Sequence, residues 1–324
     1  MIGCMHDEIQ AIFEQAGCQG ALLVQSLDAA YDTGTETAAT AIPTPIPTEF
    51  GLRADEPAIP SSVIKVLIAL VAETWFVEGR LDPREPVTIP AAGRTPGPVG
   101  LSLFQDDVTL SWRDMVVLML TISDNACTDA LIRALGLDAV NATAARLGLT
   151  ATSLESDLMT MLDSIGQDLG RADWDDLIAW SASATADESA RADTILPTAA
   201  AFDPARGTRT SPRDMVSLLR QIWDGSAGPA EACARVRAVM AKQLTRNRLA
   251  SAFRPPVRVA AKSGSLMGIV RNEIGVVTYP DGHRYAAAVF TRSRPGADDG
   301  AISAAIGAAA ARAVAVLRSD HPMR

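Results

Sequence analysis

Residues 60–71 read PSSVIKVLIALV, an almost wholly apolar run that begins at a proline and contains one lysine. The pattern predicts a long apolar helix over residues 63–78, started by Ser61 or Ser62. Because such a helix belongs in the interior, Lys65 is expected to be buried. A serine at the start of a helix and a lysine one turn later share a face, so Ser62 and Lys65 should lie within reach of each other.

The chain contains only three lysines among its 29 Lys and Arg residues. Arginine stays protonated, whereas a desolvated lysine can act as a base. A neutral Lys65 amine can take the proton of the Ser62 hydroxyl, and the helix N-terminus favours the resulting negative charge. The alternative is a helix cap followed by a surface lysine, although a buried lysine without a function is uncommon. Lys242 falls outside every motif and is expected on the surface.

A second short motif, Ser123-Asp124-Asn125, separates two apolar stretches that are predicted to be helices. Ser, Asp and Asn are favoured helix caps, so the motif could be an ordinary polar turn. In a functional interpretation, Ser123 shuttles a proton, Asp124 fixes the turn and Asn125 binds a substrate amide.

A third motif, Lys262-Ser263-Gly264-Ser265, ends an apolar strand. Lys262 is either a solvated charge at the strand end or a cation beside Ser123. In the functional interpretation, the strand edge pairs with a peptide-like substrate and Gly264 permits close approach. The backbone N–H of Ser265 would then point at an oxyanion.

Composition excludes several classes of function. The hydrophobic fraction of 48% and the charged fraction of 21% are typical of a soluble globular enzyme. A net charge of −9 argues against nucleic acid or an anionic membrane as the main partner. The most apolar stretch, residues 301–317, contains Arg312 and is not expected to span a membrane. Residues 1–50 contain no Lys or Arg, so no secretory signal is predicted and a cytoplasmic location is expected.

The cysteines and histidines argue against metal and triad chemistry. The four cysteines form no C-x-x-C pair and have no histidine nearby, so zinc is not expected. Cys127 is predicted to be a small buried residue of a helix. The three histidines lie near the termini or in a predicted turn, which argues against a Ser-His-Asp triad. We therefore expect no metal and no cofactor, and a lysine is the natural activator of a serine.

The periodic pattern predicts a helical middle flanked by two parts that contain strands. Helices are predicted over residues 5–16, 63–78, 113–121, 126–135, 140–147, 174–183, 212–223, 230–244 and 299–318. Strands are predicted over residues 20–25, 51–56, 257–262, 271–278 and 284–292, with a hairpin turn at 279–282. The two flanks can share one sheet. The predicted domains are therefore a discontinuous sheet domain, residues 1–57 and 208–324, and a helical domain, residues 58–207.

The three motifs, in this order, resemble those of the penicillin-recognising serine hydrolases and are most similar to class A β-lactamases. Ser62 and Ser123 are 61 positions apart, which fits the family, and the 139 positions from Ser123 to Lys262 exceed its usual spacing. The resemblance covers nearly the whole chain. It implies an α/β (α+β) fold of the β-lactamase/transpeptidase type. That fold has an antiparallel sheet flanked by N- and C-terminal helices and an inserted all-α domain.

The resemblance also implies a role for each residue of the motifs. Ser62 is similar to the nucleophile, Lys65 to its activator and Ser123 to the proton shuttle. Further implied contacts with substrate are Asn125 with an amide, the N–H groups of Ser62 and Ser265 with the oxyanion, and Lys262, Ser263 and Arg271 with a carboxylate. Arg271 lies nine positions after Lys262, on the neighbouring predicted strand.

One departure from the family concerns release of the acyl group. Class A enzymes carry a Glu in an E-x-x-L-N motif, and no such motif occurs here; the best register places Leu158 at that position. Glu155 and Asp157 are nearby carboxylates, and each is either a deacylation base or an ordinary loop acid. An atypical segment, residues 159–207, then follows. We expect this segment and the Thr/Pro-rich loop at residues 33–50 to shape the entrance of the site.

The sequence therefore predicts a serine hydrolase or acyltransferase that forms an acyl-Ser62 intermediate. The substrate would be a small-molecule or peptide-like amide, lactam or ester that carries a carboxylate. Two alternatives remain open: a true β-lactamase, and a non-catalytic ligand-binding protein with a β-lactamase-like fold. No nucleic acid and no membrane is expected as a partner.

Overall fold

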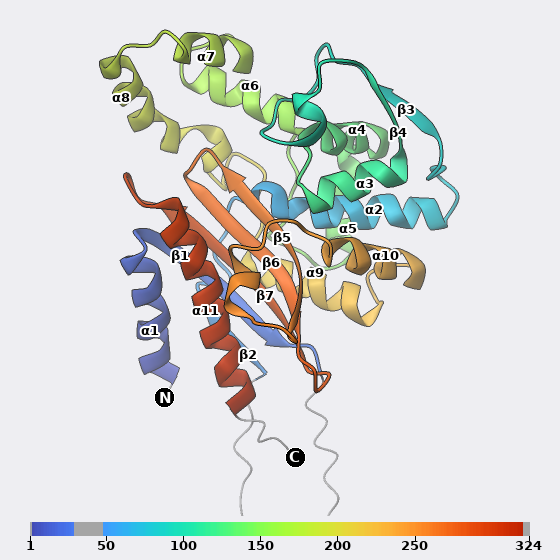
Figure 1. The fold of residues 1–324 in the computed structure, drawn as a ribbon, viewed down its shortest axis with the longest axis vertical. Helices are drawn as coiled ribbons and strands as arrows, with labels where there is room; N and C mark the ends of the chain where they lie inside the picture. Colours follow the sequence, from blue (N-terminus) through green and yellow to red (C-terminus); the bar gives the residue numbers. More distant parts are fainter. Residues whose placement is uncertain (1, 29–47, 320–324) are drawn as a thin grey trace, which may run out of the picture.

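The centre of the protein is a five-stranded antiparallel sheet, in a computed structural model that describes residues 2–28 and 48–319. Its order is β2-β1-β7-β6-β5, so the two ends of the chain build one sheet, as predicted (Figure 1). The strands are β1 (Cys18–Ser26), β2 (Glu49–Leu52), β5 (Arg258–Leu266), β6 (Val270–Thr278) and β7 (Arg284–Ser293). The predicted loop at residues 33–50 lies almost entirely outside the described residues.

Alternation along β7 gives the sheet two buried faces, because successive side chains of a strand point to opposite sides. Ala286 and Ala288 belong to the core shared with the helical region, whereas Ala287 belongs to a second core. That second core is covered by α1 (Ile2–Gln15) and α11 (Asp299–Ser319), which lie side by side on the sheet (Figure 1). The predicted first and last helices are thus confirmed.

Helix α11 is, among the described residues, the one helix long and apolar enough to cross a membrane. More than half of its apolar stretch, 56%, is buried inside the fold. We therefore assign it to the core of the sheet layer. The cytoplasmic location expected from the sequence stays a prediction.

The apolar run quoted first becomes the centre of the helical region. It begins as a short 3₁₀ turn, η1 (Ser61–Ile64), and continues as α2 (Lys65–Val77), whose residues from Lys65 to Glu73 are all buried. Four helices pack around it: α3 (Trp112–Thr121), α4 (Asn125–Leu135), α5 (Leu137–Arg146) and α10 (Ala230–Met240). Another helix, α9 (Pro212–Asp224), packs between this region and the sheet. The predicted domain boundaries stay a prediction. Helix α10 comes after residue 208, in the predicted sheet domain, and packs on α2 of the helical region.

The atypical segment forms a helical arm beyond the ends of β5 and β6 (Figure 1). It contains α6 (Leu158–Asp168), α7 (Trp174–Ser181) and α8 (Ala186–Ile195). A small apolar cluster joins the arm to the sheet through Leu266 and Val270. Arg292 of β7 also donates hydrogen bonds to two backbone oxygens of the arm, those of Pro197 (2.6 Å) and Phe202 (2.9 Å).

The sequence missed two helices of the arm and one hairpin. Helix α8 has no buried residue, so it lacks the apolar stripe on which helix prediction depends. Helix α6 begins inside what reads as a polar loop. The hairpin of β3 (Pro86–Ile89) and β4 (Val108–Ser111) consists of four-residue strands, and the connection between them, residues 90–107, is far longer than a usual hairpin loop.

Candidate active site

The turn that carries Ser62 is pinned to the sheet. Asn272, a fully buried residue of β6, donates hydrogen bonds from Nδ2 to the backbone oxygens of Ile59 (2.8 Å) and Pro60 (3.0 Å). Ser61 has a φ of 50° and donates a 2.7 Å hydrogen bond to the Ser265 oxygen of β5. A positive φ is unfavourable for serine and persists only where the surroundings enforce it. The Ser62 hydroxyl itself has no hydrogen-bond partner among the described residues.

Lys65 is fully buried, as predicted, and its amine faces the second motif. Its Nζ donates to the Ser123 backbone oxygen (2.8 Å) and to Asn125 Oδ1 (2.9 Å), and lies 3.4 Å from Ser123 Oγ. Burial lowers the pKa of Lys65 from its ordinary value to about 7, against the opposing effect of the buried Asp124 carboxylate. The amine is therefore poised to give and take a proton near neutral pH.

The Ser123-Asp124-Asn125 turn is a rigid, polar corner of the site. Asp124 is buried and accepts hydrogen bonds from the backbone N–H groups of Cys127 (2.8 Å) and Leu101 (2.6 Å), so it caps α4 and fixes the turn as predicted. Ser123 has a φ of 67°. Cys127 is fully buried, which confirms its predicted place in a helix. Asn125 bridges Lys65 and the Pro96 oxygen, to which its Nδ2 donates at 2.9 Å.

The Lys262-Ser263-Gly264-Ser265 motif lies on β5, the edge strand beside Ser62. Lys262 is fully buried, so it is not a solvated charge at the strand end, and its Nζ donates to the Ser263 oxygen at 2.7 Å. Burial, and then the positive charge of Lys65, holds the pKa of Lys262 well below its usual range. The two buried amines thus belong to one electrostatic site.

Gly264 allows β5 to lie directly against the Ser62 turn. A Cβ atom at this position would lie 2.9 Å from the Pro60 oxygen and 3.0 Å from the Ser62 nitrogen. Both neighbours are backbone atoms, which cannot rotate away. We expect Gly264→Ala to lower the acylation rate of Ser62 at least about tenfold, because β5 or the turn must shift. Stopped-flow acylation would measure this, with Gly300→Ala as control, because a Cβ atom at that exposed position in the first turn of α11 would meet only the Asp298 side chain; equal rates would contradict the contact.

Arg248 is a candidate site residue that the sequence reasoning missed. It is 5% exposed, and it donates from Nη1 to the Gly264 oxygen (2.7 Å) and from Nη2 to Ser265 Oγ (2.5 Å). Its Nε has no partner among the described residues. A buried guanidinium therefore lies against the Gly264–Ser265 part of β5. No local pattern marks it, since it comes from a polar loop before the 3₁₀ turn η5 (Leu249–Ala252).

Arg271, the predicted carboxylate partner, is engaged elsewhere. It is paired with Ser265 in the β5–β6 ladder, but its side chain forms an ion pair with Asp299 at the start of α11, with Nε 2.9 Å from Oδ1. It does not line the cavity that contains Ser62. The substrate contact of Arg271 stays a prediction, and Arg248 is the guanidinium that the fold places against Ser265.

A cavity of about 320 Å³ opens beside Ser62. Its lining includes Asn125 and Ser265 from the second and third motifs, together with residues of the helical arm. The structure thus brings residues from three distant parts of the sequence to one space.

The two carboxylates considered for deacylation also line this cavity, but both have partners. Glu155 accepts from Ser153 Oγ (2.6 Å) and pairs with Arg209 (2.9 Å). Asp157 caps α6 by accepting from the Thr160 N–H at 2.9 Å. A catalytic role for Glu155 or Asp157 stays a prediction. Leu158 lines the cavity as an apolar residue.

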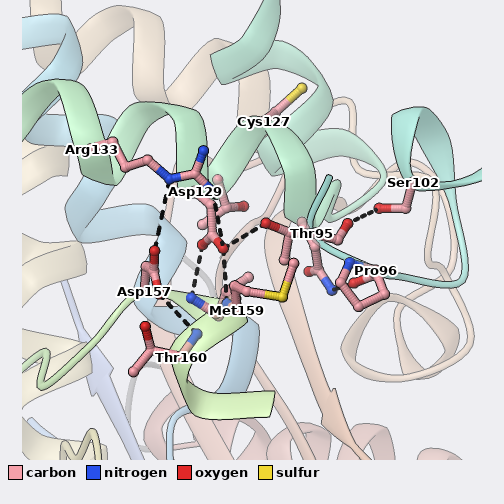
Figure 2. Close-up of polar contacts among 12 residues, drawn as sticks. Thr95, Pro96, Ser102, Cys127, Asp129, Arg133, Asp157, Met159 and Thr160 are labelled. Atoms are coloured by element: carbon pink, nitrogen blue, oxygen red, sulfur yellow. Dashed lines mark hydrogen bonds and ion pairs between the residues drawn. The ribbon is translucent and has the colours of Figure 1, made fainter. Parts of the chain in front are cut away.

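A third carboxylate, Asp129 of α4, was not predicted and organises one wall of the site (Figure 2). It is fully buried and accepts hydrogen bonds from the N–H groups of Leu158 (2.8 Å) and Met159 (2.9 Å) and from Thr95 Oγ1 (2.7 Å). Figure 2 shows Thr95 and the start of α6 on different sides of the carboxylate. Asp129 thus joins α4, which carries Asn125, to the start of α6, where Leu158 lines the cavity, and to the Thr95 segment.

Comparison with known proteins places the chain in a family. A profile of the Beta-lactamase enzyme family matches residues 5–317. The chain belongs to this family. One relative is the beta-lactamase regulatory protein BlaB of Streptomyces cacaoi, 28% identical over 264 residues, which span 77% of this chain and 82% of that protein. The family resemblance inferred from the three motifs is confirmed.

Solved structures show that the fold is shared. A beta-lactamase from Sphaerobacter thermophilus has a TM-score of 0.72 at 22% identity, over 99% of this chain and 98% of that one. PBP-A has a TM-score of 0.71 at 20% identity, over 98% and 96%. A PBP-A mutant forms an acyl-enzyme complex with penicillin G. The predicted β-lactamase-like fold of this family member is confirmed.

Proposed function

We propose that this protein is a serine hydrolase or acyltransferase that acts through an acyl-Ser62 intermediate. Its substrate is an amide, lactam or ester that carries a carboxylate. The observation that carries the proposal is Lys65: a fully buried amine, one helical turn from Ser62, with a pKa lowered to about 7 and bonded to the Ser123-Asp124-Asn125 turn. Strongly perturbed groups at a cavity are typical of catalytic sites.

In the proposed reaction, neutral Lys65 takes the proton of Ser62 as Oγ bonds to the substrate carbonyl carbon. The carbonyl oxygen becomes an oxyanion that the N–H groups of Ser62 and Ser265 stabilise. The bond from that carbon to the leaving nitrogen or oxygen then breaks. The proton passes from Lys65 through the Ser123 hydroxyl to the leaving atom. Water or another acceptor finally takes the acyl group, and Ser62 regains its proton.

Intact-protein mass spectrometry tests the proposal. We expect incubation with benzylpenicillin, or with a carboxylate-bearing thioester, to add one acyl group to Ser62, and Ser62→Ala to remain unmodified. Peptide mapping would locate the adduct. An unmodified protein with both reagents, under conditions that acylate a control β-lactamase, would overturn the proposal.

Two buried cations, Lys262 of β5 and Arg248 beside Ser265, suggest how a carboxylate is held, and we assign this contact to them. We expect Arg248→Met to lower the acylation efficiency for a carboxylate substrate about tenfold to a hundredfold, the loss of one charge-assisted hydrogen bond. Arg271→Met should change it less than about threefold, because Asp299 already occupies that guanidinium. Steady-state or single-turnover kinetics would measure both.

The matched methyl ester of the same substrate is the control for disturbed packing. It lacks the negative charge, so Arg248→Met should reduce its acylation much less. An equal loss for acid and ester would mean that Arg248 only supports the β5 backbone. A larger effect of Arg271→Met would restore the sequence-based assignment.

Release of the acyl group is proposed to be slow. Leu158 lines the cavity where the family resemblance implies a glutamate, and the carboxylates of Glu155 and Asp157 are engaged. We expect Leu158→Glu to raise the deacylation rate at least about tenfold by adding a general base, whereas Leu158→Gln should not. Decay of the acyl-enzyme mass after removal of excess substrate would measure both, and equal decay would argue against a base at this position.

A second candidate function is a ligand sensor that is acylated and stays acylated. The observations that favour it are the same engaged carboxylates and the regulatory role in the name of the relative BlaB. A true β-lactamase is the opposite outcome. With the chromogenic cephalosporin nitrocefin, one burst equal to the enzyme concentration supports the sensor, and continued turnover supports the β-lactamase.

A further inference from the structure

The cavity beside Ser62 has an apolar wall. Seven large aliphatic or thioether side chains line it, and they come from η1 and the chain just before it, the arm, the segment before the arm, and β5. They are Ile59, Ile64, Leu154, Leu158, Met161, Leu162 and Leu266. Leu162 and Leu266 also belong to the apolar cluster that attaches the arm to the sheet. The arm therefore extends an apolar surface to the position of the reacting serine.

The charged groups that line the cavity are already paired within the protein. These pairs are Glu155 with Arg209 (2.9 Å), Asp157 with Arg133 (3.8 Å) and Arg206 with Asp203 (3.0 Å). A ligand charge would have to compete with these partners. The lining also contains hydroxyl groups, among them those of Ser156, Thr160 and Thr208, but its larger side chains are apolar, so the space suits a group that brings no charge.

The cations that suit a substrate carboxylate lie outside this lining. Lys262 belongs to β5, and Arg248 donates to Gly264 and Ser265 of that strand; both are buried, and neither is among the described residues that form the cavity wall. The two halves of a substrate would therefore meet different chemistry on either side of Ser62. One half meets buried cations and the other meets an apolar space of about 320 Å³, at the lower end of the range for ligand pockets.

We infer that this cavity binds the acyl half of the substrate, and that this half is an uncharged alkyl or aryl group. The inference rests on the proposed function and adds its substrate class: an amide, lactam or ester of a medium-length apolar acid. Met161 is the residue best suited to test it. Its side chain is half-buried and lines the cavity, so a polar substitution changes the wall without opening the core.

Binding of unreactive ligands tests the inference without requiring acyl transfer. The protein would carry Ser62→Ala, and isothermal titration calorimetry would compare N-octanoylglycine with N-acetylglycine, which share amide and carboxylate. The octanoyl chain has six more methylenes, each of which strengthens binding by up to about fourfold when buried. We expect octanoylglycine to bind at least about tenfold more tightly.

Two matched variants locate the effect. Met161→Gln should reduce the octanoyl-to-acetyl ratio at least about threefold, because it places an amide in the apolar wall. Met159→Gln, half-buried on the same turn of α6 but outside the cavity lining, should retain the ratio. A ratio near one, or a ratio that Met161→Gln leaves unchanged, overturns the inference. Failure of Ser62 acylation alongside a retained ratio would instead overturn the proposed reaction and leave the apolar site standing.

Discussion

Lys65→Arg is expected to lower the rate of Ser62 acylation by about a thousandfold or more. Arginine keeps the positive charge but does not lose its proton near neutral pH, so the general base disappears. General-base catalysis contributes about a hundredfold to ten-thousandfold, and the bulkier guanidinium adds a steric loss in a fully buried site. Single-turnover acylation with benzylpenicillin or a thioester would measure the change.

Lys242→Arg is the matched control for this experiment. Lys242 is exposed on the loop after α10, as the sequence predicted, and should tolerate arginine without change in rate. If Lys65→Arg acylates as fast as the control, Lys65 is not the base.

The wild-type rate should also depend on pH through Lys65. Acylation needs the neutral amine, so the rate should rise with pH and reach half of its maximum near pH 7, the pKa set by burial. The same shift affects stability. Unfolded Lys65 keeps its proton up to about 10.5, so the unfolded state binds more protons between pH 7 and 10.5. The free energy of unfolding due to this residue should therefore rise with pH across that window. A pH-independent acylation rate from pH 5 to 9 would contradict this assignment.

Asp129→Ala should lower the free energy of unfolding by about 3–5 kcal/mol. The substitution leaves the Leu158 and Met159 N–H groups and the Thr95 hydroxyl without their acceptor, and each group left unsatisfied in the interior costs about 1–3 kcal/mol. The start of α6 and the Thr95 segment should loosen together, since one carboxylate holds both. Urea denaturation would measure the loss.

Asp157→Ala provides the comparison within the same cluster. Asp157 caps the same helix but is partly exposed, so its loss should cost only about 1 kcal/mol. Hydrogen exchange should show faster exchange at Leu158 and Met159 in the Asp129 variant. A loss of stability no larger than that of Asp157→Ala would show that Asp129 does not organise this wall.

The elements that the sequence predicted well are those with a strong periodic pattern. The buried helix after Ser62, the three C-terminal strands and the last helix have long apolar patterns that fix their type, although β5 continues to Leu266, four residues beyond its predicted end, and so contains the whole third motif. The two helices that the sequence missed, α6 and α8, lack such a pattern. Helix α8 buries no side chain, and α6 is held at its start by Asp129, a residue almost thirty positions away that no local pattern connects to it.

The residues of the candidate site likewise divide into those that a local pattern predicts and those that no local pattern predicts. Ser62, Lys65 and the two later motifs were found because each is a short local signal, and scarce lysine made two of them conspicuous. Arg248 and Asn272 carry no such signal, although both are buried and bond to the backbone around Ser62 and Ser265. Their importance comes from contacts between segments that are far apart in the chain.

The sequence by itself predicted a β-lactamase-like protein with one serine and two lysines at the centre of its site, and it predicted the burial of Lys65 but not that of Lys262. Those residues follow from local spacing and from the chemistry that lysine has and arginine lacks. Only the tertiary structure decided which arginine lies beside β5, which carboxylates already have partners, and that the arm turns an apolar wall toward Ser62. Each of these depends on the packing of segments that are far apart in the chain. A side chain of the right type can act only where the fold leaves its charge unpaired or its surface open.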